Sequence, residues 1–191
     1  MEKLKQKILK DGQVIENRIL KVDNFLNHKI DIQLFNDIGK EFKKRFQNKE
    51  VTKILTAEVS GIAIAAITAQ YFDNVPVVFA KKHDASNLNS NTYESEVYSF
   101  TKNKTYKLRV DKNYISCEDK VLIIDDFLAS GSAASALIDI LYKSKAEIVG
   151  MGIVIEKNFQ GGRKLVEEKG VKLESLAIID SFEDGVVKFV K

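Results

Sequence analysis

The sequence predicts an α/β protein whose central sheet is mainly parallel and is covered by helices on both faces. Apolar runs of strand length alternate along the chain with helical patterns. Repeated strand–helix–strand order is typical of parallel sheets, which are buried on both faces. The chain has 191 residues without a repeat, linker or low-complexity tract, so we expect a single domain over residues 1–191.

The first half of the chain alternates helix and strand. Residues 31–49 carry apolar side chains at spacings of three and four, which predicts an amphipathic helix. Residues 51–58 and 75–82 are typical of strands, and the apolar run 61–72 between them predicts a helix buried on most sides. The only proline, Pro76, falls at the start of the second strand, where a missing hydrogen-bond donor matters least.

The second half begins with a polar stretch over about 83–95 that has no periodicity and predicts a mobile loop. The alternating segments 96–102 and 104–111 predict a β-hairpin. Three core strands and two helices follow in the prediction: strands at 120–126, 147–157 and 172–182, and helices at about 130–143 and 161–170.

Composition limits the partners and the cellular compartment that the sequence predicts. Lys and Arg exceed Asp and Glu by 30 to 27, an excess too small to predict a nucleic-acid partner. The longest apolar stretch, 61–69, is far shorter than the ~20 residues that span a bilayer, and the start of the chain lacks a signal-peptide core. The single cysteine, Cys117, excludes an internal disulfide. We therefore expect a cytoplasmic protein without nucleic-acid or membrane partners.

The stretch VLIIDDFLASGSAA (121–134) carries the clearest chemical signal. In parallel sheets ligands bind at the carboxyl ends of strands, where Asp125 and Asp126 fall. The helix that follows begins with small residues, so a phosphate can approach its free backbone N–H groups, and Ser130 and Ser132 add hydroxyl donors. The carboxylates can accept hydrogen bonds from ribose hydroxyls or hold water around Mg²⁺. The pattern predicts a site for a ribose 5-phosphate group.

On these residues alone, other interpretations stay open. An acidic pair after an apolar strand also occurs in receiver domains and in the metal sites of nucleotidases, although a receiver carries its pair on the first strand. From these residues alone, Ser60 in TAEVSGI is better explained as the cap of a helix after a tight βα turn. Lys82 can be a solvated cation at a strand end rather than a ligand-binding residue. Asn27 can be a turn residue rather than part of a binding site.

The stretch 121–134 resembles the phosphoribosyl pyrophosphate motif of type I phosphoribosyltransferases, in which an apolar strand, two acidic residues, two apolar residues and a small Gly-containing loop follow one another. Other segments resemble the xanthine branch of the purine salvage members, in order and over nearly the whole chain. These are LKVDNFLNHKID (20–31), PVVFAKKH (76–83), VYSFTK (97–102) and GIVIEKNFQ (152–160). The resemblance implies the fold of that family, with a small hood formed by about 1–30 and 157–191, and it implies a homodimer.

The resemblance also implies roles for particular residues. Asp125 and Asp126 would be catalytic, and Lys157 would donate to the exocyclic oxygen of the purine, with Leu20 and Asn27 of the hood touching the same base. The residues implied to bind phosphoribosyl pyrophosphate are Ala129, Ser130, Gly131, Ser132, Ala133, Glu58, Ser60, Gly61 and Lys82. Mg²⁺ would arrive on the pyrophosphate, so no metal site on the protein itself is expected.

One departure from the family pattern concerns the general base. Many purine members carry an Asp and a Thr before the loop glycine, whereas this chain has Ala129 and Ser130. That carboxylate role therefore cannot be carried over. Xanthine ionises more readily than hypoxanthine or guanine, so we hypothesise that a cationic site binds it already deprotonated.

The resemblance implies conversion of xanthine and 5-phosphoribosyl 1-pyrophosphate to xanthosine 5′-monophosphate and pyrophosphate. The first alternative is an enzyme that prefers hypoxanthine or guanine. The second is a non-catalytic regulator that senses phosphoribosyl pyrophosphate on the same fold. Such regulators add a winged-helix domain or a basic face, and we expect no room for that domain between Met1 and Asn27.

Overall fold

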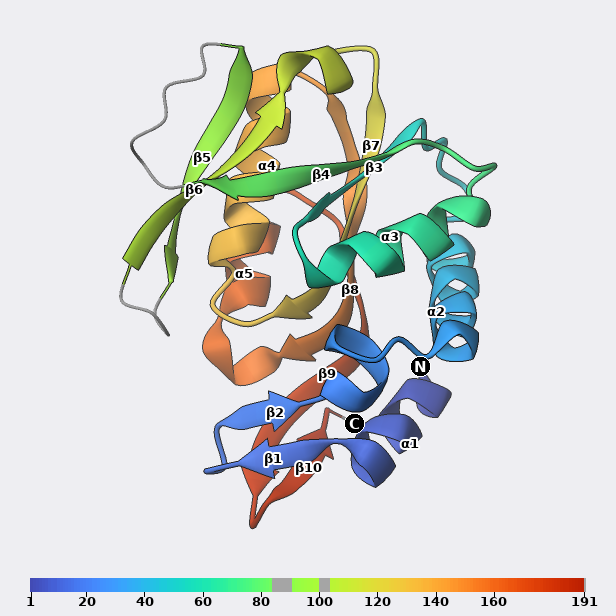
Figure 1. The fold of residues 1–191 in the computed structure, drawn as a ribbon, viewed down its shortest axis with the longest axis vertical. Coiled ribbons are helices and arrows are strands. Elements are labelled where there is room, and N and C mark those ends of the chain that lie inside the picture. Colours follow the sequence, from blue (N-terminus) through green and yellow to red (C-terminus); the bar gives the residue numbers. More distant parts are fainter. Residues whose placement is uncertain (84–90, 100–103, 191) are drawn as a thin grey trace.

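Figure 1 shows the computed structural model of the chain, which describes residues 1–83, 91–99 and 104–190. Within these residues the main sheet has eight strands, of which the five in the middle are parallel and the others join antiparallel at the two edges. The predicted mainly parallel sheet is confirmed. In spatial order the strands are β10 (Val186–Phe189), β9 (Leu173–Glu183), β8 (Glu147–Lys157), β7 (Lys120–Leu128), β3 (Lys53–Ala57), β4 (Val77–His83), β6 (Lys104–Asp111) and β5 (Thr92–Ser99).

Helices cover both faces of this sheet, as the sequence predicts (Figure 1). The helices are α1 (Glu2–Asp11), α2 (Ile32–Arg45), α3 (Ser60–Gln70), α4 (Ser132–Ser144) and α5 (Gly162–Glu168). Three single turns connect elements: η1 (Asp23–Asn27), η2 (Lys112–Tyr114) and η3 (Asn158–Gln160). In these described ranges no helix is both long enough and apolar enough to cross a bilayer.

The central strand β7 divides the core into two layers because its side chains alternate between faces. Leu122 and Ile124 are buried in the cluster that α2 and α3 complete. Val121 and Ile123 are buried in the cluster that α4, α5 and the β5–β6 hairpin complete. All four side chains are fully buried, which explains why this strand reads as a continuous apolar run rather than as an alternating one.

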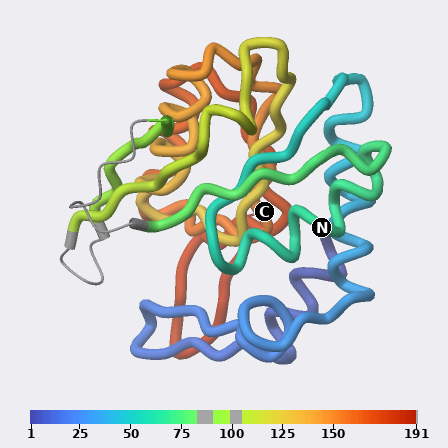
Figure 2. The backbone as a smooth tube through the Cα atoms, turned by 45° about the horizontal axis from the view of Figure 1, so that its top comes forward, coloured from blue at the N-terminus to red at the C-terminus, as the bar shows by residue number. Residues whose placement is uncertain are grey.

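A smaller layer, which we call the hood, lies at one end of the sheet (Figures 1 and 2). It contains α1, the two-stranded ribbon of β1 (Gln13–Ile15) and β2 (Ile19–Lys21), and η1, and it packs against β9 and β10. Leu4, Ile8 and Phe25 are buried there in the same cluster as Val187 of β10. The hood, formed by the first elements of the chain, therefore packs against the last two strands.

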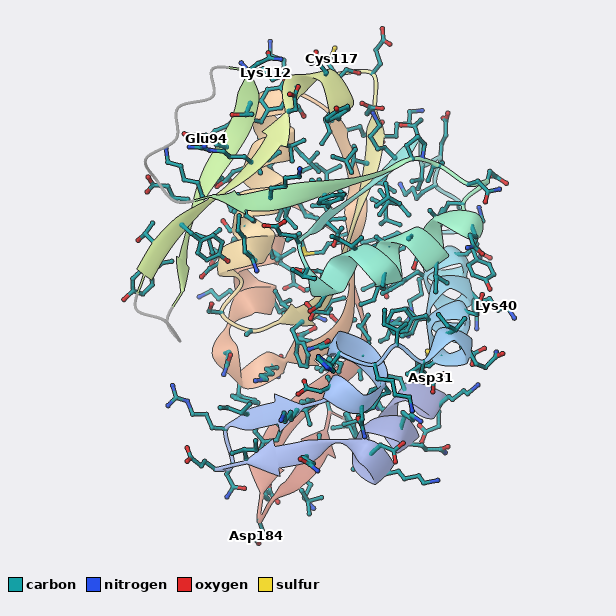
Figure 3. All side chains as sticks on the ribbon, in the orientation of Figure 1. Asp31, Lys40, Glu94, Lys112, Cys117 and Asp184 are labelled. Atoms are coloured by element: carbon teal, nitrogen blue, oxygen red, sulfur yellow. The ribbon has the colours of Figure 1, made fainter. Side chains whose placement is uncertain are left out.

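The predicted hairpin exists, but it begins earlier than the pattern indicates. Strand β5 starts at Thr92 and pairs with β6 along its whole length. The Glu94 carboxylate accepts hydrogen bonds from Lys107 Nζ at 2.5 Å and Arg109 Nε at 2.9 Å, both on β6 (Figure 3). These cross-strand pairs stabilise a polar stretch as a strand. Of the loop predicted over about 83–95, residues 84–90 lie outside the described residues.

The carboxylate of Asp31 caps the N-terminus of helix α2, at the junction between the hood and the main sheet (Figure 3). Asp31 Oδ1 accepts a hydrogen bond of 3.0 Å from the backbone N–H of Leu34, and Lys7 Nζ lies 3.4 Å from Asp31 Oδ2. The hydrogen bond from Leu34 holds the pKa of Asp31 below its usual value of 3.8, and Lys7 contributes in the same direction. The charged form of Asp31 therefore stabilises the fold.

We expect Asp31→Ala to lower the free energy of unfolding by about 1 kcal/mol at pH 7, because the first turn of α2 loses its cap. A carboxylate with a lowered folded pKa contributes stability above its unfolded pKa and loses it as pH falls through the folded value. The difference between variant and parent should therefore shrink below pH 3.8. Urea unfolding at pH 7 and pH 3 measures it. Asp31→Asn keeps a good cap, so its free energy of unfolding should fall much less than that of Asp31→Ala. An equal fall in both variants would mean that the ion pair with Lys7, and not the cap, supplies the stability.

Candidate functional site

A cleft of about 720 Å³ lies between the carboxyl edge of the sheet and the hood. The loop after β7 and the start of α4 form one wall, from Ala129 to Ala134. Lys157 and Gln160 line it from the end of β8, and Arg18 and Ile19 line it from the hood. Tyr98 and Tyr106 of the hairpin also line it.

The loop between β7 and α4 has the geometry of an anion site. Gly131 has φ +84°, which favours glycine, and α4 begins at the next residue. The backbone N–H groups of the first turn of α4 have no intrahelical acceptors, and the helix dipole adds partial positive charge. The hydroxyl oxygens of Ser130 and Ser132 lie 3.1 Å apart beside them. The structure therefore places the predicted phosphate-binding residues, Ala129 to Ala133, together on the cleft wall.

The acidic pair lies directly before this loop and is largely buried. Asp125 is 8 % exposed, and its Oδ1 accepts a hydrogen bond of 3.0 Å from the backbone N–H of Asp126. Asp126 Oδ1 in turn accepts one of 2.8 Å from the backbone N–H of Phe127. Burial raises the pKa of both carboxyl groups, and the neighbouring Asp126 raises that of Asp125 further. The charged form of each carboxyl group is thus costly here, and a ligand that donates hydrogen bonds to the two carboxylates would offset this cost.

The segment that follows β3 packs against the acidic pair. Glu58 accepts a hydrogen bond of 2.6 Å from the backbone N–H of Lys82 at the end of β4. A Cβ at Gly61 would fall 2.0 Å from Thr56 Oγ1 and 2.9 Å from Asp125 Oδ1, so only glycine fits there.

Two more predicted groups act on the same carboxylates. The Ser60 hydroxyl lowers the pKa of Asp126 by hydrogen bonding, and the charge of Lys82 lowers that of Asp125, in both cases against the larger effect of burial. The structure thus brings Glu58, Ser60, Gly61 and Lys82 together beside the acidic pair, as predicted.

Lys157 ends β8 and is half-buried between two aromatic rings. Its Nζ lies 5.8 Å from the ring centroids of both Phe127 and Phe182. Burial lowers its pKa, and the nearby charge of Arg18 lowers it further. Within the described ranges no carboxylate forms an ion pair with Lys157 or Arg18. A half-buried lysine and an exposed arginine that line the same cleft favour an anionic ligand.

For the two hood residues, contact with a base remains a prediction. Leu20 is 6 % exposed and belongs to the hood core, and Asn27 is exposed at the end of η1. Neither lines the cleft, whereas Arg18 and Ile19 do. Sequence reasoning missed Arg18, which follows the Glu16–Asn17 turn of the β1–β2 ribbon, where both residues have positive φ.

No group of three or more metal-ligating side chains occurs in the part of the chain that the structure describes. Asp125 and Asp126 directly precede the loop that lines the cleft, and their oxygens suit ribose hydroxyls or water bound to Mg²⁺. These donors fit a metal ion that enters with a phosphorylated ligand.

Comparison with known proteins adds the following. Residues 21–186 match the family described as "Phosphoribosyl transferase domain". The chain is 66 % identical over 189 residues to a xanthine phosphoribosyltransferase of Clostridium novyi (strain NT), covering 99 % of each, and 65 % identical to one of Clostridium tetani, covering 99 % of this chain and 100 % of that protein. Its fold is similar to that of the adenine phosphoribosyltransferase of Trypanosoma brucei, with a TM-score of 0.76 and 20 % identity over 92 % of this chain and 78 % of that one.

We expect Asp125→Asn to stabilise the folded protein above neutral pH while preserving the acceptor for the Asp126 amide. An acid whose folded pKa is raised loses stability as pH rises from 3.8 through the folded value, and the asparagine has no charge to bury. Each kcal/mol gained should raise Tm by roughly 2–4 °C in a chain of this size. Thermal unfolding at pH 8 and pH 4 measures the difference, which should vanish at the lower pH. Asp180→Asn, on an exposed position of β9, is the control and should change neither value.

Proposed function

The chain belongs to the phosphoribosyltransferase family, as its sequence predicts, and we propose that it transfers the phosphoribosyl group of 5-phosphoribosyl 1-pyrophosphate to xanthine. The products are xanthosine 5′-monophosphate and pyrophosphate. The end-to-end relatives at 60–66 % identity carry the name xanthine phosphoribosyltransferase, which supports this choice of base.

The observation that carries the proposal is Lys157 in the same cleft as the loop from Ala129 to Ala133. A half-buried cation without a carboxylate partner in the described residues suits an oxopurine, and best an oxopurine anion. Adenine presents an amino group where xanthine presents an oxygen, so it would require an acceptor at this position. The likeness to adenine phosphoribosyltransferases at 20 % identity concerns the fold alone.

The phosphoribosyl donor occupies the other half of the site in this proposal. The 5′-phosphate lies on the backbone N–H groups of the Gly131 loop, and the ribose hydroxyls donate to Asp125 and Asp126. The pyrophosphate, which brings Mg²⁺ as part of the substrate, lies beside Glu58–Gly61 and Lys82. This arrangement is supported by the packing of those segments against the acidic pair.

The reaction follows from these positions. A purine ring nitrogen attacks C1 of the ribose while pyrophosphate leaves, and the ribose passes through a cation-like state. The Asp125 and Asp126 carboxylates hold the ribose and stabilise its positive charge, and the loop holds the phosphate in place. Lys157 stabilises the base as its anion, so no side chain is needed at Ala129 to remove a proton.

We also propose that the protein acts in the cytoplasm as a homodimer, without a nucleic-acid or membrane partner. Cys117 is free and exposed, which suits a reducing compartment. Val59, which is 75 % exposed before the apolar helix α3, and Phe79 on β4 are exposed apolar side chains that a second copy would cover.

The test of the function is a substrate panel. Xanthine, hypoxanthine, guanine and adenine are each supplied with 5-phosphoribosyl 1-pyrophosphate and Mg²⁺, and nucleotide formation is followed. We expect kcat/KM to be highest for xanthine. A preference for hypoxanthine or guanine would support the alternative salvage enzyme, and binding of the donor without turnover of any base would support a regulator.

We expect Gly131→Ala to weaken binding of 5-phosphoribosyl 1-pyrophosphate by roughly tenfold or more, because hydrogen bonds to a charged phosphate contribute about 1.5–3 kcal/mol each. The added Cβ would lie 3.0 Å from Gly162 Cα in a backbone conformation that favours glycine, so the loop must move. Isothermal titration with the donor measures the loss. Gly170→Ala is the matched control, since φ there is +69° but nothing lies within 4 Å of the new Cβ. Equal donor affinity in both variants would contradict the assignment.

We expect Lys157→Ala to raise the KM for xanthine by roughly 30- to 150-fold, the equivalent of about 2–3 kcal/mol for one charge-assisted hydrogen bond in a closed site. The KM for the donor should change little. In the parent, KM for xanthine should fall as pH rises through ionisation of the base and rise again as Lys157 loses its proton. The second limb should be absent in the variant.

Lys43→Ala is the control for this experiment, because its Nζ also lies over an aromatic ring, 4.8 Å from the centroid of Phe72, and Lys43 does not line the cleft. Lys43→Ala should match the parent. If Lys157→Ala affected xanthine and hypoxanthine equally, binding of an anionic base would be excluded. If it affected neither, Lys157 would not contact the base.

A further inference from the structure

One residue before Lys157 lies a carboxylate that is fully withdrawn from solvent. Glu156 is 0 % exposed, and both of its carboxylate oxygens accept hydrogen bonds. Arg163 at the start of α5 donates from Nε to Oε1 at 2.8 Å and from Nη2 to Oε2 at 2.6 Å. Ser175 of β9 donates its hydroxyl to Oε2 at 2.5 Å. The hydrogen bonds to Glu156 raise the pKa of Arg163, which keeps the guanidinium charged.

The pair joins the two ends of a short segment. Residues 157–162 lie between Glu156 and Arg163, and they contain Lys157, the turn η3 and the glycines Gly161 and Gly162. Successive residues of a strand point to opposite faces, so a fixed Glu156 also fixes the direction of Lys157. The planar fork of arginine, held by two hydrogen bonds, allows little rotation of this segment.

The far end of the segment packs against the phosphate loop. The backbone N–H of Gly162 donates to the carbonyl oxygen of Ala129 at 3.0 Å. A Cβ at Gly162 would lie 2.5 Å from that oxygen and 3.0 Å from the nitrogen of Gly131. The two backbones therefore touch without any side chain between them. A displacement of Gly162 must displace the loop.

Stability alone is a weak reason for such a pair, because buried ion pairs can often be replaced by apolar residues without loss of stability. We propose that Glu156 and Arg163 are positioning residues that hold Lys157 and the Ala129–Gly131 loop in register, and so couple the base subsite to the phosphate subsite. The proposal rests on the proposed function for the identity of the two ligands. Neither Glu156 nor Arg163 touches a substrate in it.

The test is Arg163→Lys, which keeps the charge and loses the two-pronged contact. We expect KM for xanthine and KM for 5-phosphoribosyl 1-pyrophosphate each to rise roughly tenfold, since small misplacements of binding groups are costly. Glu167→Gln is the matched control, because it removes the other partner of Arg163, 3.0 Å from Nη1 and 55 % exposed. The control should keep parental KM values. Parental KM values in Arg163→Lys would overturn the proposal.

A double variant distinguishes a positioning role of Arg163 from a general loss of structure. In Lys157→Ala protein, Arg163→Lys should leave the KM for xanthine unchanged, because the side chain through which it acts is gone, and should still raise the KM for the donor roughly tenfold. Multiplicative losses for xanthine in the double variant would overturn the link through Lys157. An unchanged KM for the donor would overturn the link through Gly162.

Failure of the proposed function is detected independently. If the parent does not use xanthine, the proposed function fails, but titration of the donor alone into the parent and Arg163→Lys still measures the link to the loop. If Arg163→Lys does not fold, Glu156→Gln serves instead, since it keeps the shape and an acceptor for Ser175. Glu156→Gln should weaken donor binding in the same direction, and parental donor affinity in it would overturn the proposal.

Discussion

Burying the Asp125 carboxylate at the end of β7 forces its neighbours to supply hydrogen bonds and positive charge, because an ionised group without water is otherwise costly. The Asp126 amide supplies the hydrogen bond, and Lys82 supplies the charge. Gly61 approaches so closely that a methyl group would collide with the carboxylate. These groups meet because β3 pairs in parallel with both β4 and β7, which brings three strand ends to one edge. The parallel pairing of these strands is therefore the cause of the arrangement of the site.

The acidic pair and Lys157 carry opposite charges, and burial disfavours the charged form of each. Burial favours the neutral acids at Asp125 and Asp126 and favours the neutral amine at Lys157. A ligand with hydroxyl donors at one end and an anionic ring at the other relieves both costs at once. Binding of such a ligand should therefore be stronger than its contact area indicates, and the ligand-free protein carries the cost as reduced stability.

Most of the sheet and half of the site could be predicted because their signals are local. The apolar run into Asp125 and Asp126, followed by small residues, sets strand, turn and helix start within one short stretch. Arg18 could not be found this way, since its place beside Lys157 depends on how the hood packs on the sheet. Glu156 was equally hidden, because one letter in an apolar strand does not reveal whether Arg163 pairs with it. The start of β5 was placed too late, because cross-strand ion pairs of Glu94 outweigh its polar sequence.

The hood brings the two ends of the chain together. Its helix α1 packs against β9 and β10, and Asn17 of the β1–β2 ribbon accepts a hydrogen bond from the backbone N–H of Gly185. The ribosome releases α1 long before β10, so the early segment has no partner until synthesis is nearly finished. The phosphate loop and the acidic pair, by contrast, depend mainly on β3, β4, β7 and α4, which emerge earlier and fold through contacts closer in sequence. During synthesis the phosphate loop and the acidic pair can therefore form first, and the hood can pack in place only with the last strand.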